Sequence, residues 1–224
     1  MLDKDGCITM SPRPNPRQID TLKRLGSATI HEAQGQSGAF DASLRPLDPT
    51  RRLAGVALTV DCRAGDSLVI HYALTKAVPG DVLVVDAKGF TESGPWGDLL
   101  TLAAQKRGVA GLVIDGAVRD AEMIIQRGFP VFARSISLKG TLKNQPGRVG
   151  ANIICGGQLV RSGDLIVGDR DGLTVIPAGE IDAVIAAAEE RERKEQKMRE
   201  RIESGEMTVD ILDLRPTLQR LGMG

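Results

Sequence analysis

Hydrophobic and polar positions along the chain alternate in two ways, which predict strands and helices in turn. Short apolar runs bounded by glycine, proline or aspartate predict strands at 51–61, 82–86, 112–114, 131–133, 153–155, 165–168 and 173–177. Apolar residues at helical spacing predict helices at 18–25, 29–36, 66–77, 99–107, 121–126 and from 180 to about 203. A mixture of this kind fits a layered α/β sandwich.

The two ends of the chain depart from this pattern. Residues 1–16 contain Pro12, Pro14 and Pro16 and are expected to form an extended arm. The last predicted helix is apolar in its first half and almost entirely charged in its second half, so only the first half has a face to bury. Because no linker divides the chain, residues 1–224 are expected to form a single domain.

A short motif occurs twice, at Gly80-Asp81 and at Gly163-Asp164. Each copy precedes a run of apolar residues, as a tight turn feeding a buried strand would. We interpret the pair as one local device used twice rather than as a domain repeat.

Composition limits the classes of function. Lys and Arg number 29, as do Asp and Glu, so no overall field attracts nucleic acid or an anionic membrane. Aromatic residues make up 3%, which argues against an RNA-reading surface. Cys7, Cys62 and Cys155 show no C-x-x-C spacing, and no segment has the pattern of a signal peptide or the length of a membrane span. We therefore expect a soluble, cytoplasmic protein that binds neither nucleic acid nor membrane.

The stretch 92–120 carries the candidate chemistry. It reads as a glycine-rich turn, a helix, a buried strand, a turn at Asp115-Gly116, and an Arg119-Asp120 pair that opens the next helix. The helix after Gly97 offers backbone N–H groups to an anion, Arg119 offers a planar donor fork, and Asp120 offers a hard oxygen ligand. The same residues also fit a structural interpretation, as helix caps and surface ion pairs, and spacing alone leaves that alternative open.

A resemblance favours the chemical interpretation. Asp98, followed after twenty residues by Arg119-Asp120, resembles the D-x20-R-D signature of the class II pyruvate aldolases. These enzymes cleave 4-hydroxy-4-methyl-2-oxoglutarate and 4-carboxy-4-hydroxy-2-oxoadipate, and share their fold with the regulator of ribonuclease activity A. Segments 28–35, 79–86, 96–98 and 163–169 are also similar to the family, and the likeness covers about 19–206. Ser67 departs from it, since many relatives carry asparagine there.

The resemblance implies a fold, an assembly and a reaction. The fold would be a three-layer β/β/α swivelling-type sandwich with helical N- and C-terminal segments. The assembly would be a homotrimer or a dimer of trimers, with the C-terminal helix 180–206 at a subunit interface. The reaction would be metal-dependent retro-aldol cleavage of either oxo acid to pyruvate and a second 2-oxo acid, with oxaloacetate decarboxylation as a side activity.

It also implies roles for individual residues. Asp120 would be the protein ligand of Mg²⁺ or Mn²⁺, and Arg119 would hold the ketone oxygen and the developing enolate. Asp98 would position a water that delivers a proton to the enolate. The remaining substrate contacts would be made at the helix end by the residues Gly97, Asp98, Leu99 and Leu100.

Two glutamates would complete the site. Glu32 would orient waters around the metal, and Glu195 would reach the site from a neighbouring subunit, with Glu192 as the alternative. As ordinary residues, all three would be solvated charges on helices. A lone histidine such as His31 is more often a helix-face donor than a catalytic base, and both interpretations stay open. His71, on an apolar helix, is expected to be packed, with contact to substrate as the alternative.

Three other classes compete with this interpretation. A Schiff-base aldolase would need a desolvated lysine, for which Lys88 is the best placed candidate. A methyltransferase would need a glycine-rich nucleotide loop, which the segment 86–93 lacks. A non-enzymatic regulator that binds a ribonuclease would share the fold; the segment His31 to Gly35 favours the enzyme.

Overall fold

The computed structural model describes residues 13–223, which form ten strands and seven helices. The strands are β1 (Arg45–Pro46), β2 (Leu53–Asp61), β3 (Asp81–Phe90), β4 (Gly111–Val118), β5 (Val131–Ile136), β6 (Arg148–Val149), β7 (Ile153–Cys155), β8 (Gln158–Val160), β9 (Leu165–Gly168) and β10 (Leu173–Ile176). The helices are α1 (Pro16–Ala33), α2 (Leu68–Lys76), α3 (Asp98–Lys106), α4 (Ala121–Gln126), α5 (Ile181–Glu203), α6 (Thr208–Ile211) and α7 (Arg215–Arg220).

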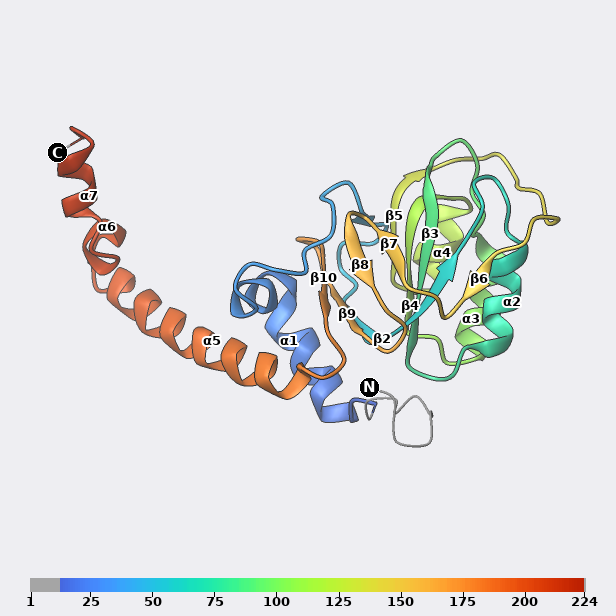
Figure 1. The fold of residues 1–224 in the computed structure, drawn as a ribbon. Coiled ribbons are helices and arrows are strands. Elements are labelled where there is room, and N and C mark those ends of the chain that lie inside the picture. Colours follow the sequence, from blue (N-terminus) through green and yellow to red (C-terminus); the bar gives the residue numbers. More distant parts are fainter. Residues whose placement is uncertain (1–12, 224) are drawn as a thin grey trace.

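One curled sheet organises the molecule, with strand order β1-β5-β4-β3-β2-β9-β10 and β6 beside β2. Strands β2 to β5 run parallel, and β1, β6, β9 and β10 pair antiparallel to their neighbours. Helices α2, α3 and α4 cover one face, and the β7–β8 hairpin lies over the other (Figure 1). The α/β sandwich with helical segments at both ends is thereby confirmed.

Strand β3 shows why the sequence builds two cores. Leu83 and Val85 pack toward the helices, whereas Val82 and Val84 pack toward the hairpin, and all four are fully buried. A strand covered on both faces needs a continuous apolar run, and burying each such side chain contributes about 1.5–3 kcal/mol.

Helix α1 contains a kink at Gly26, whose φ of 79° and ψ of 165° are not helical. The sequence predicted two helices in this stretch, and the kink separates them. Asp169 caps the second one, because its carboxylate accepts hydrogen bonds from the Ser27 backbone N–H at 2.8 Å and the Ser27 hydroxyl at 2.6 Å. The proline-rich arm proposed for residues 1–16 falls mostly outside the described residues, and α1 itself begins at Pro16.

The repeated Gly-Asp motif does have one structural use. Asp81 Oδ2 accepts a hydrogen bond from the Val78 N–H at 2.9 Å, and Asp164 Oδ2 accepts one from the Arg161 N–H at 2.8 Å. In both copies the aspartate closes the turn on the residue three positions before it, so the interpretation as a local device is confirmed.

The turn predicted at Asp115-Gly116 is wrong, because both residues lie inside β4. The Asp115 carboxylate is buried and accepts hydrogen bonds from the Arg134 side chain and from the Gly156 N–H. A Cβ at Gly116 would lie 2.9 Å from the Ala87 Cβ, so this glycine permits close strand packing rather than a turn.

The C-terminal helix follows its prediction and then continues into new elements. Its first part packs on α1 through Val184 and Ala188, whereas the rest of α5 projects from the body and carries α6 and α7 at its far end (Figure 1). Within residues 13–223, no helix combines the length and apolar composition needed to cross a membrane.

Candidate functional site

The predicted signature residues meet where the turn before α3 touches the end of β4. The Arg119 backbone N–H donates to the Trp96 carbonyl at 2.9 Å, which joins the two segments. A Cβ at Gly94 would lie 2.8 Å from the Arg119 nitrogen, and a Cβ at Gly97 would lie 2.5 Å from Asp120 Oδ2. Both glycines are therefore required by close approach to the Arg119-Asp120 corner.

The buried Trp96 side chain anchors this turn to the core. Its ring is fully buried and stacks on Phe129, with ring centroids 6.2 Å apart. The indole N–H donates to the Thr101 hydroxyl at 2.7 Å, which in turn donates to the Gly97 carbonyl at 3.0 Å. The first turn of α3 is thus held rigidly, as a preorganised binding site requires.

Asp120 is the N-cap residue of α4 and adopts a left-handed conformation with φ 53°. Its Oδ2 accepts a hydrogen bond from the Asp98 N–H at 3.1 Å and lies 3.5 Å from Arg119 Nε. The side chains of Arg119 and Asp120 are 44% and 41% exposed, so both still face solvent. A non-glycine residue with positive φ carries strain that is often found at functional sites.

The Asp98 side chain turns away from this corner toward α4. Its carboxylate forms a bidentate pair with the Arg127 guanidinium, whose hydrogen bonds hold the pKa of Asp98 below its ordinary value. The backbone of Asp98 contacts Asp120, but its carboxylate is engaged with Arg127.

A cavity of about 160 Å³ opens beside the corner, a size that suits a small metabolite. Four of the predicted substrate-binding residues line it: Gly97, Leu99, Leu100 and Arg119. Four further residues, from the start of α2 and from the loop after β5, also line it: Ser67 at the N-cap of α2, His71, Thr141 and Lys143. His71 is exposed, yet partial desolvation of its ring and, secondarily, the charge of Lys143 keep the pKa of His71 below its usual value.

The start of α3 provides donors to this cavity. The Asp98 N–H is already taken by Asp120, whereas the N–H groups of Leu99 and Leu100 have no acceptor among residues 13–223. The Gly97 N–H likewise has no acceptor in this part of the chain, so the anion cradle predicted at this helix end keeps three N–H groups, those of Gly97, Leu99 and Leu100.

Asp120 fits a divalent cation that keeps most of its water. Its carboxylate is partly exposed beside the cavity, and a Cβ on Gly97 would intrude on it. No cluster of three or more His, Cys, Asp or Glu side chains able to hold a metal is found within the described part of the chain. A hard cation such as Mg²⁺ or Mn²⁺ accepts one carboxylate with waters in the remaining positions, so the donor set fits.

Glu32 and Glu195 lie together, but away from the cavity of their own chain. Both contact Arg191: Arg191 Nη1 is 3.7 Å from Glu32 Oε2, and Arg191 Nε is 3.0 Å from Glu195 Oε1. Helices α1 and α5, which carry them, lie at the β9–β10 end of the sheet, whereas α3 packs with α2 and α4 on the helix-covered face (Figure 1). Glu192 instead pairs with Arg24 at 2.5 Å, which ties α5 to α1.

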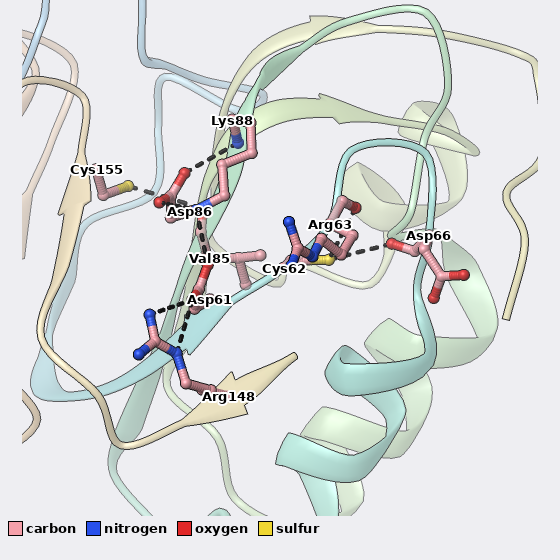
Figure 2. Close-up of polar contacts among 9 residues, drawn as sticks. All are labelled: Asp61, Cys62, Arg63, Asp66, Val85, Asp86, Lys88, Arg148 and Cys155. Atoms are coloured by element: carbon pink, nitrogen blue, oxygen red, sulfur yellow. Dashed lines mark hydrogen bonds and ion pairs between the residues drawn. The ribbon is translucent and has the colours of Figure 1, made fainter. Parts of the chain in front are cut away.

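His31 and Lys88 have structural partners. His31 Nδ1 lies 2.8 Å from the Ser37 carbonyl. The Lys88 ammonium lies between Asp61 and Asp86, at 2.7 and 2.5 Å (Figure 2). Partial burial lowers the pKa of Lys88, but these two hydrogen bonds outweigh it and hold the pKa above its ordinary value. A Schiff-base nucleophile needs the opposite shift.

The described cysteines behave as buried hydrophobic residues. Burial raises the pKa of the Cys62 thiol to about 12 and shifts the pKa of Cys155 further in the same direction. Cys62 donates to the Asp66 carbonyl at 3.1 Å (Figure 2). Neither thiol has the depressed pKa of a nucleophile. Cys7 falls outside the described residues.

Sequence reasoning missed Arg127, Thr141 and Lys143. Arg127 ends α4, and its only sequence signal is a basic residue near a helix C-terminus. Thr141 and Lys143 belong to a long irregular loop, and its contacts with the Ser67 region could not be read from local patterns. Ser67 and His71, which the sequence analysis had singled out, do line the same cavity.

The fold and the cavity beside Arg119 and Asp120 define an α/β protein with a site for a small molecule. Comparison with known proteins identifies its family. The RraA-like family model, described as Aldolase/RraA, matches residues 27–175. The chain therefore belongs to the RraA-like family.

Relatives carry two kinds of name. A protein of Halalkalibacterium halodurans is 36% identical over 191 residues, covering 85% of this chain and 91% of the relative; its name, 4-hydroxy-4-methyl-2-oxoglutarate aldolase, is provisional. The structure of an uncharacterized Pseudomonas syringae protein has a TM-score of 0.78 at 27% identity, covering 88% and 93%. Streptomyces coelicolor RraAS2, from the RNase ES inhibitor RraA protein family, has a TM-score of 0.73 at 28% identity, covering 84% and 98%.

Proposed function

We propose that the protein is a lyase that cleaves 4-hydroxy-2-oxo acids by a retro-aldol reaction. The expected substrates are 4-hydroxy-4-methyl-2-oxoglutarate and 4-carboxy-4-hydroxy-2-oxoadipate, and the products are pyruvate and a second 2-oxo acid. One observation carries the proposal: Arg119 lines a small cavity directly beside the Asp120 carboxylate and the first turn of α3.

The reaction breaks the C3–C4 bond. The C4 hydroxyl loses its proton, the electron pair of the C3–C4 bond moves to C3, and C4 becomes the carbonyl carbon of the second product. The enolate of pyruvate that remains takes a proton at C3. Arg119 donates hydrogen bonds to the C2 oxygen as negative charge develops there, which is electrostatic stabilisation by a fixed donor. The N–H groups of Leu99 and Leu100 hold the C1 carboxylate.

Asp120 would hold Mg²⁺ or Mn²⁺ together with water. Such a cation, when bound, would polarise the C2 ketone and stabilise the enolate. Oxaloacetate yields the same enolate when its C3–C4 bond breaks and CO₂ leaves, so we expect oxaloacetate decarboxylation as a side activity. Asp98 is expected to position the water that delivers the proton to C3, which would require its carboxylate to exchange Arg127 for that water.

The working enzyme would be a homo-oligomer, a trimer or a dimer of trimers. Glu32 and Glu195 pair with Arg191 and do not line the cavity of their own chain, so in this proposal both would act on a neighbouring subunit's site. They would order water around the cation without binding it directly.

The deciding assay follows pyruvate release from 4-hydroxy-4-methyl-2-oxoglutarate and from oxaloacetate with Mg²⁺, and then with EDTA. EDTA should abolish both reactions and Mg²⁺ or Mn²⁺ should restore both. Asp120→Asn should lose most of the turnover, because asparagine tolerates the left-handed conformation but lacks the charge. Glu122→Gln, also on α4, is the control. Activity that survives EDTA, or a pyruvate adduct trapped on a lysine by borohydride, would refute the proposal.

A second candidate function is regulation of a ribonuclease. The similarity to RraAS2, of the RNase ES inhibitor family, supports it. Adding the purified protein to RNase ES acting on RNA tests it, and inhibition together with no pyruvate release from either substrate would favour this alternative.

A further inference from the structure

His71 lies one turn into α2 and lines the cavity beside Arg119. Ile70 and Leu74, on the same helix, are buried in the core, whereas His71 is exposed. The His71 backbone N–H donates to the Ser67 carbonyl at 3.2 Å, so this residue belongs to the first hydrogen-bonded turn of the helix. A rigid element therefore presents the imidazole ring to the cavity.

The start of α2 is clamped to the loop after β5. The Asp66 carboxylate is buried and accepts hydrogen bonds from the Leu68 N–H at 2.8 Å and the Asn144 N–H at 2.9 Å. The Ser67 N–H donates to the Leu142 carbonyl at 2.9 Å. A buried carboxylate that bonds to backbone donors of both segments holds them in one position. The helix that carries His71 is thus preorganised against the cavity.

Both ring nitrogens of His71 are available to a ligand. Among residues 13–223 neither makes a hydrogen bond, whereas His31 Nδ1 lies 2.8 Å from the Ser37 carbonyl. Partial desolvation and, secondarily, the charge of Lys143 lower the pKa of His71, so the ring is mostly neutral at neutral pH. A neutral imidazole has one nitrogen with a free lone pair, which can accept a proton.

The retro-aldol reaction needs a group that removes the proton from the C4 hydroxyl. In the proposed function, Arg119 and the N–H groups of α3 are engaged by the C2 oxygen and the C1 carboxylate. The Ser67 and Thr141 hydroxyls, which also line the cavity, are bonded to each other at 3.0 Å, and an alcohol is a poor base. The ammonium group of Lys143 has no lone pair. His71 is the titratable side chain of the lining that remains able to accept a proton.

We propose that His71 is a catalytic residue, the general base that removes the proton from the C4 hydroxyl of the substrate. This inference rests on the proposed retro-aldol function. A ring nitrogen takes the proton, the electron pair of the O–H bond forms the C4 carbonyl, and the electron pair of the C3–C4 bond stays with C3 as the enolate. His71 returns its proton to solvent after the second 2-oxo acid leaves, and C3 is protonated separately.

The kinetic test compares a substrate that has a C4 hydroxyl with one that has none. Oxaloacetate forms the same enolate, but its C4 leaves as CO₂ and no hydroxyl proton has to be removed. His71→Asn should lower turnover of 4-hydroxy-4-methyl-2-oxoglutarate about a hundredfold to ten-thousandfold and leave oxaloacetate decarboxylation near the wild-type rate. Tyr72→Phe, at the exposed neighbouring position off the cavity, is the control and should keep both rates. Equal losses on both substrates, or no loss on either in a folded His71→Asn protein, would overturn the assignment.

A base that must be neutral makes the reaction depend on pH. In the wild type, kcat/KM for the hydroxy acid should fall as the pH drops through the pKa of His71, which lies below its ordinary value of 6.5. The charged side chains that line the cavity with it are Lys143 and Arg119, and neither residue type ordinarily titrates in that range. The acid limb should be missing from the residual activity of His71→Asn. A limb at the same pH in that variant would show that another group is the base.

Chemical rescue separates a base from a structural residue. His71→Ala leaves space for free imidazole, which should restore part of the turnover of the hydroxy acid in proportion to the concentration of its neutral form. A ring that only supported the helix would not be replaced in this way. If the wild type cleaved both substrates but imidazole restored nothing and the two reactions fell together, the His71 assignment alone would fail. If the wild type released pyruvate from neither substrate, the retro-aldol function would fail, and the base with it.

Discussion

The Asp120 carboxylate accepts a hydrogen bond from the backbone N–H of Asp98, at 3.1 Å. The two signature residues, twenty-two positions apart, are therefore one structural unit: the helix that begins at Asp98 orients the proposed metal ligand. Asp98 in turn holds α4 through Arg127. The spacing of the signature follows from the path through α3 and β4 that returns the chain to this corner.

Gly97→Ala should damage the site without unfolding the protein. The added Cβ would lie 2.5 Å from Asp120 Oδ2 and 3.0 Å from the Arg119 Cγ, so both side chains must move. We expect turnover in the pyruvate-release assay to fall about tenfold to a thousandfold, as when a single positioned donor is lost. Gly179→Ala is the control, because its Cβ meets nothing within 4 Å. Normal turnover in Gly97→Ala would show that this corner is not where the chemistry occurs.

The pair of Asp98 and Arg127 should make stability depend on pH. Hydrogen bonds from Arg127 depress the pKa of Asp98 in the folded state, so the pair stabilises the fold above the ordinary pKa of 3.8. That contribution is lost as the pH falls through the folded-state value. Arg127→Gln should therefore lower Tm at about pH 7, and the gap to the wild type should close at acid pH. Scanning calorimetry across the pH range checks this, and a gap that did not change with pH would contradict it.

Sequence patterns predicted the elements around the site because nearby residues specify each of those elements. The glycines before α3 and the apolar spacing of α3 lie within a few residues of the structure they specify. The turn predicted at Asp115-Gly116 was wrong because distant residues decide the structure there. The dipeptide is typical of turns, yet the Asp115 carboxylate accepts hydrogen bonds from Arg134 and Gly156, which are distant in the chain.

Long-range contacts also explain what the sequence could not place. The loop that carries Lys143 has no periodic pattern, and its position depends on Asp66, seventy-eight residues before Asn144. The pairing of Glu32 and Glu195 through Arg191 likewise depends on the packing of α5 against α1.

Asp169→Ala tests the capped kink in α1. The Asp169 carboxylate accepts from the Ser27 N–H and hydroxyl and from the Asp171 N–H, so its removal leaves three donors unsatisfied. We expect the free energy of unfolding to fall by about 1–2 kcal/mol in urea denaturation, the range found for lost helix caps. Asp171→Ala keeps the Asp171 backbone N–H and is the control. Equal stability of the two variants would rule out the cap.

Arg119→Lys separates charge from geometry. Lysine keeps the positive charge but loses the planar fork that can hold the C2 oxygen in a fixed direction. We expect turnover on 4-hydroxy-4-methyl-2-oxoglutarate to fall about tenfold to a thousandfold. Arg170→Lys, at an exposed position, is the control. If lysine supported normal turnover, positive charge alone would be sufficient at this position.

Glu195→Gln tests whether α5 completes a neighbouring site. The outer part of α5 has little apolar surface and projects from the body, so it gains little from packing on its own chain (Figure 1). Among residues 13–223, Glu195 pairs only with Arg191 and Arg199 on the same helix, whereas Glu192 pairs with Arg24 on α1. We therefore expect Glu195→Gln to reduce turnover with assembly intact, and Glu192→Gln to affect mainly stability.

Mixed oligomers of Glu195→Gln and Asp120→Ala subunits give the decisive measurement for that helix. If Glu195 acts across the interface, some contacts in a mixed oligomer pair an intact Asp120 with an intact Glu195. Activity should then exceed the sum of the two variants assayed separately. If Glu195 acted only within its own chain, each Glu195→Gln subunit would lack the glutamate and each Asp120→Ala subunit would lack the metal ligand. Mixing would then recover nothing, and the outer half of α5 would be a solvated surface.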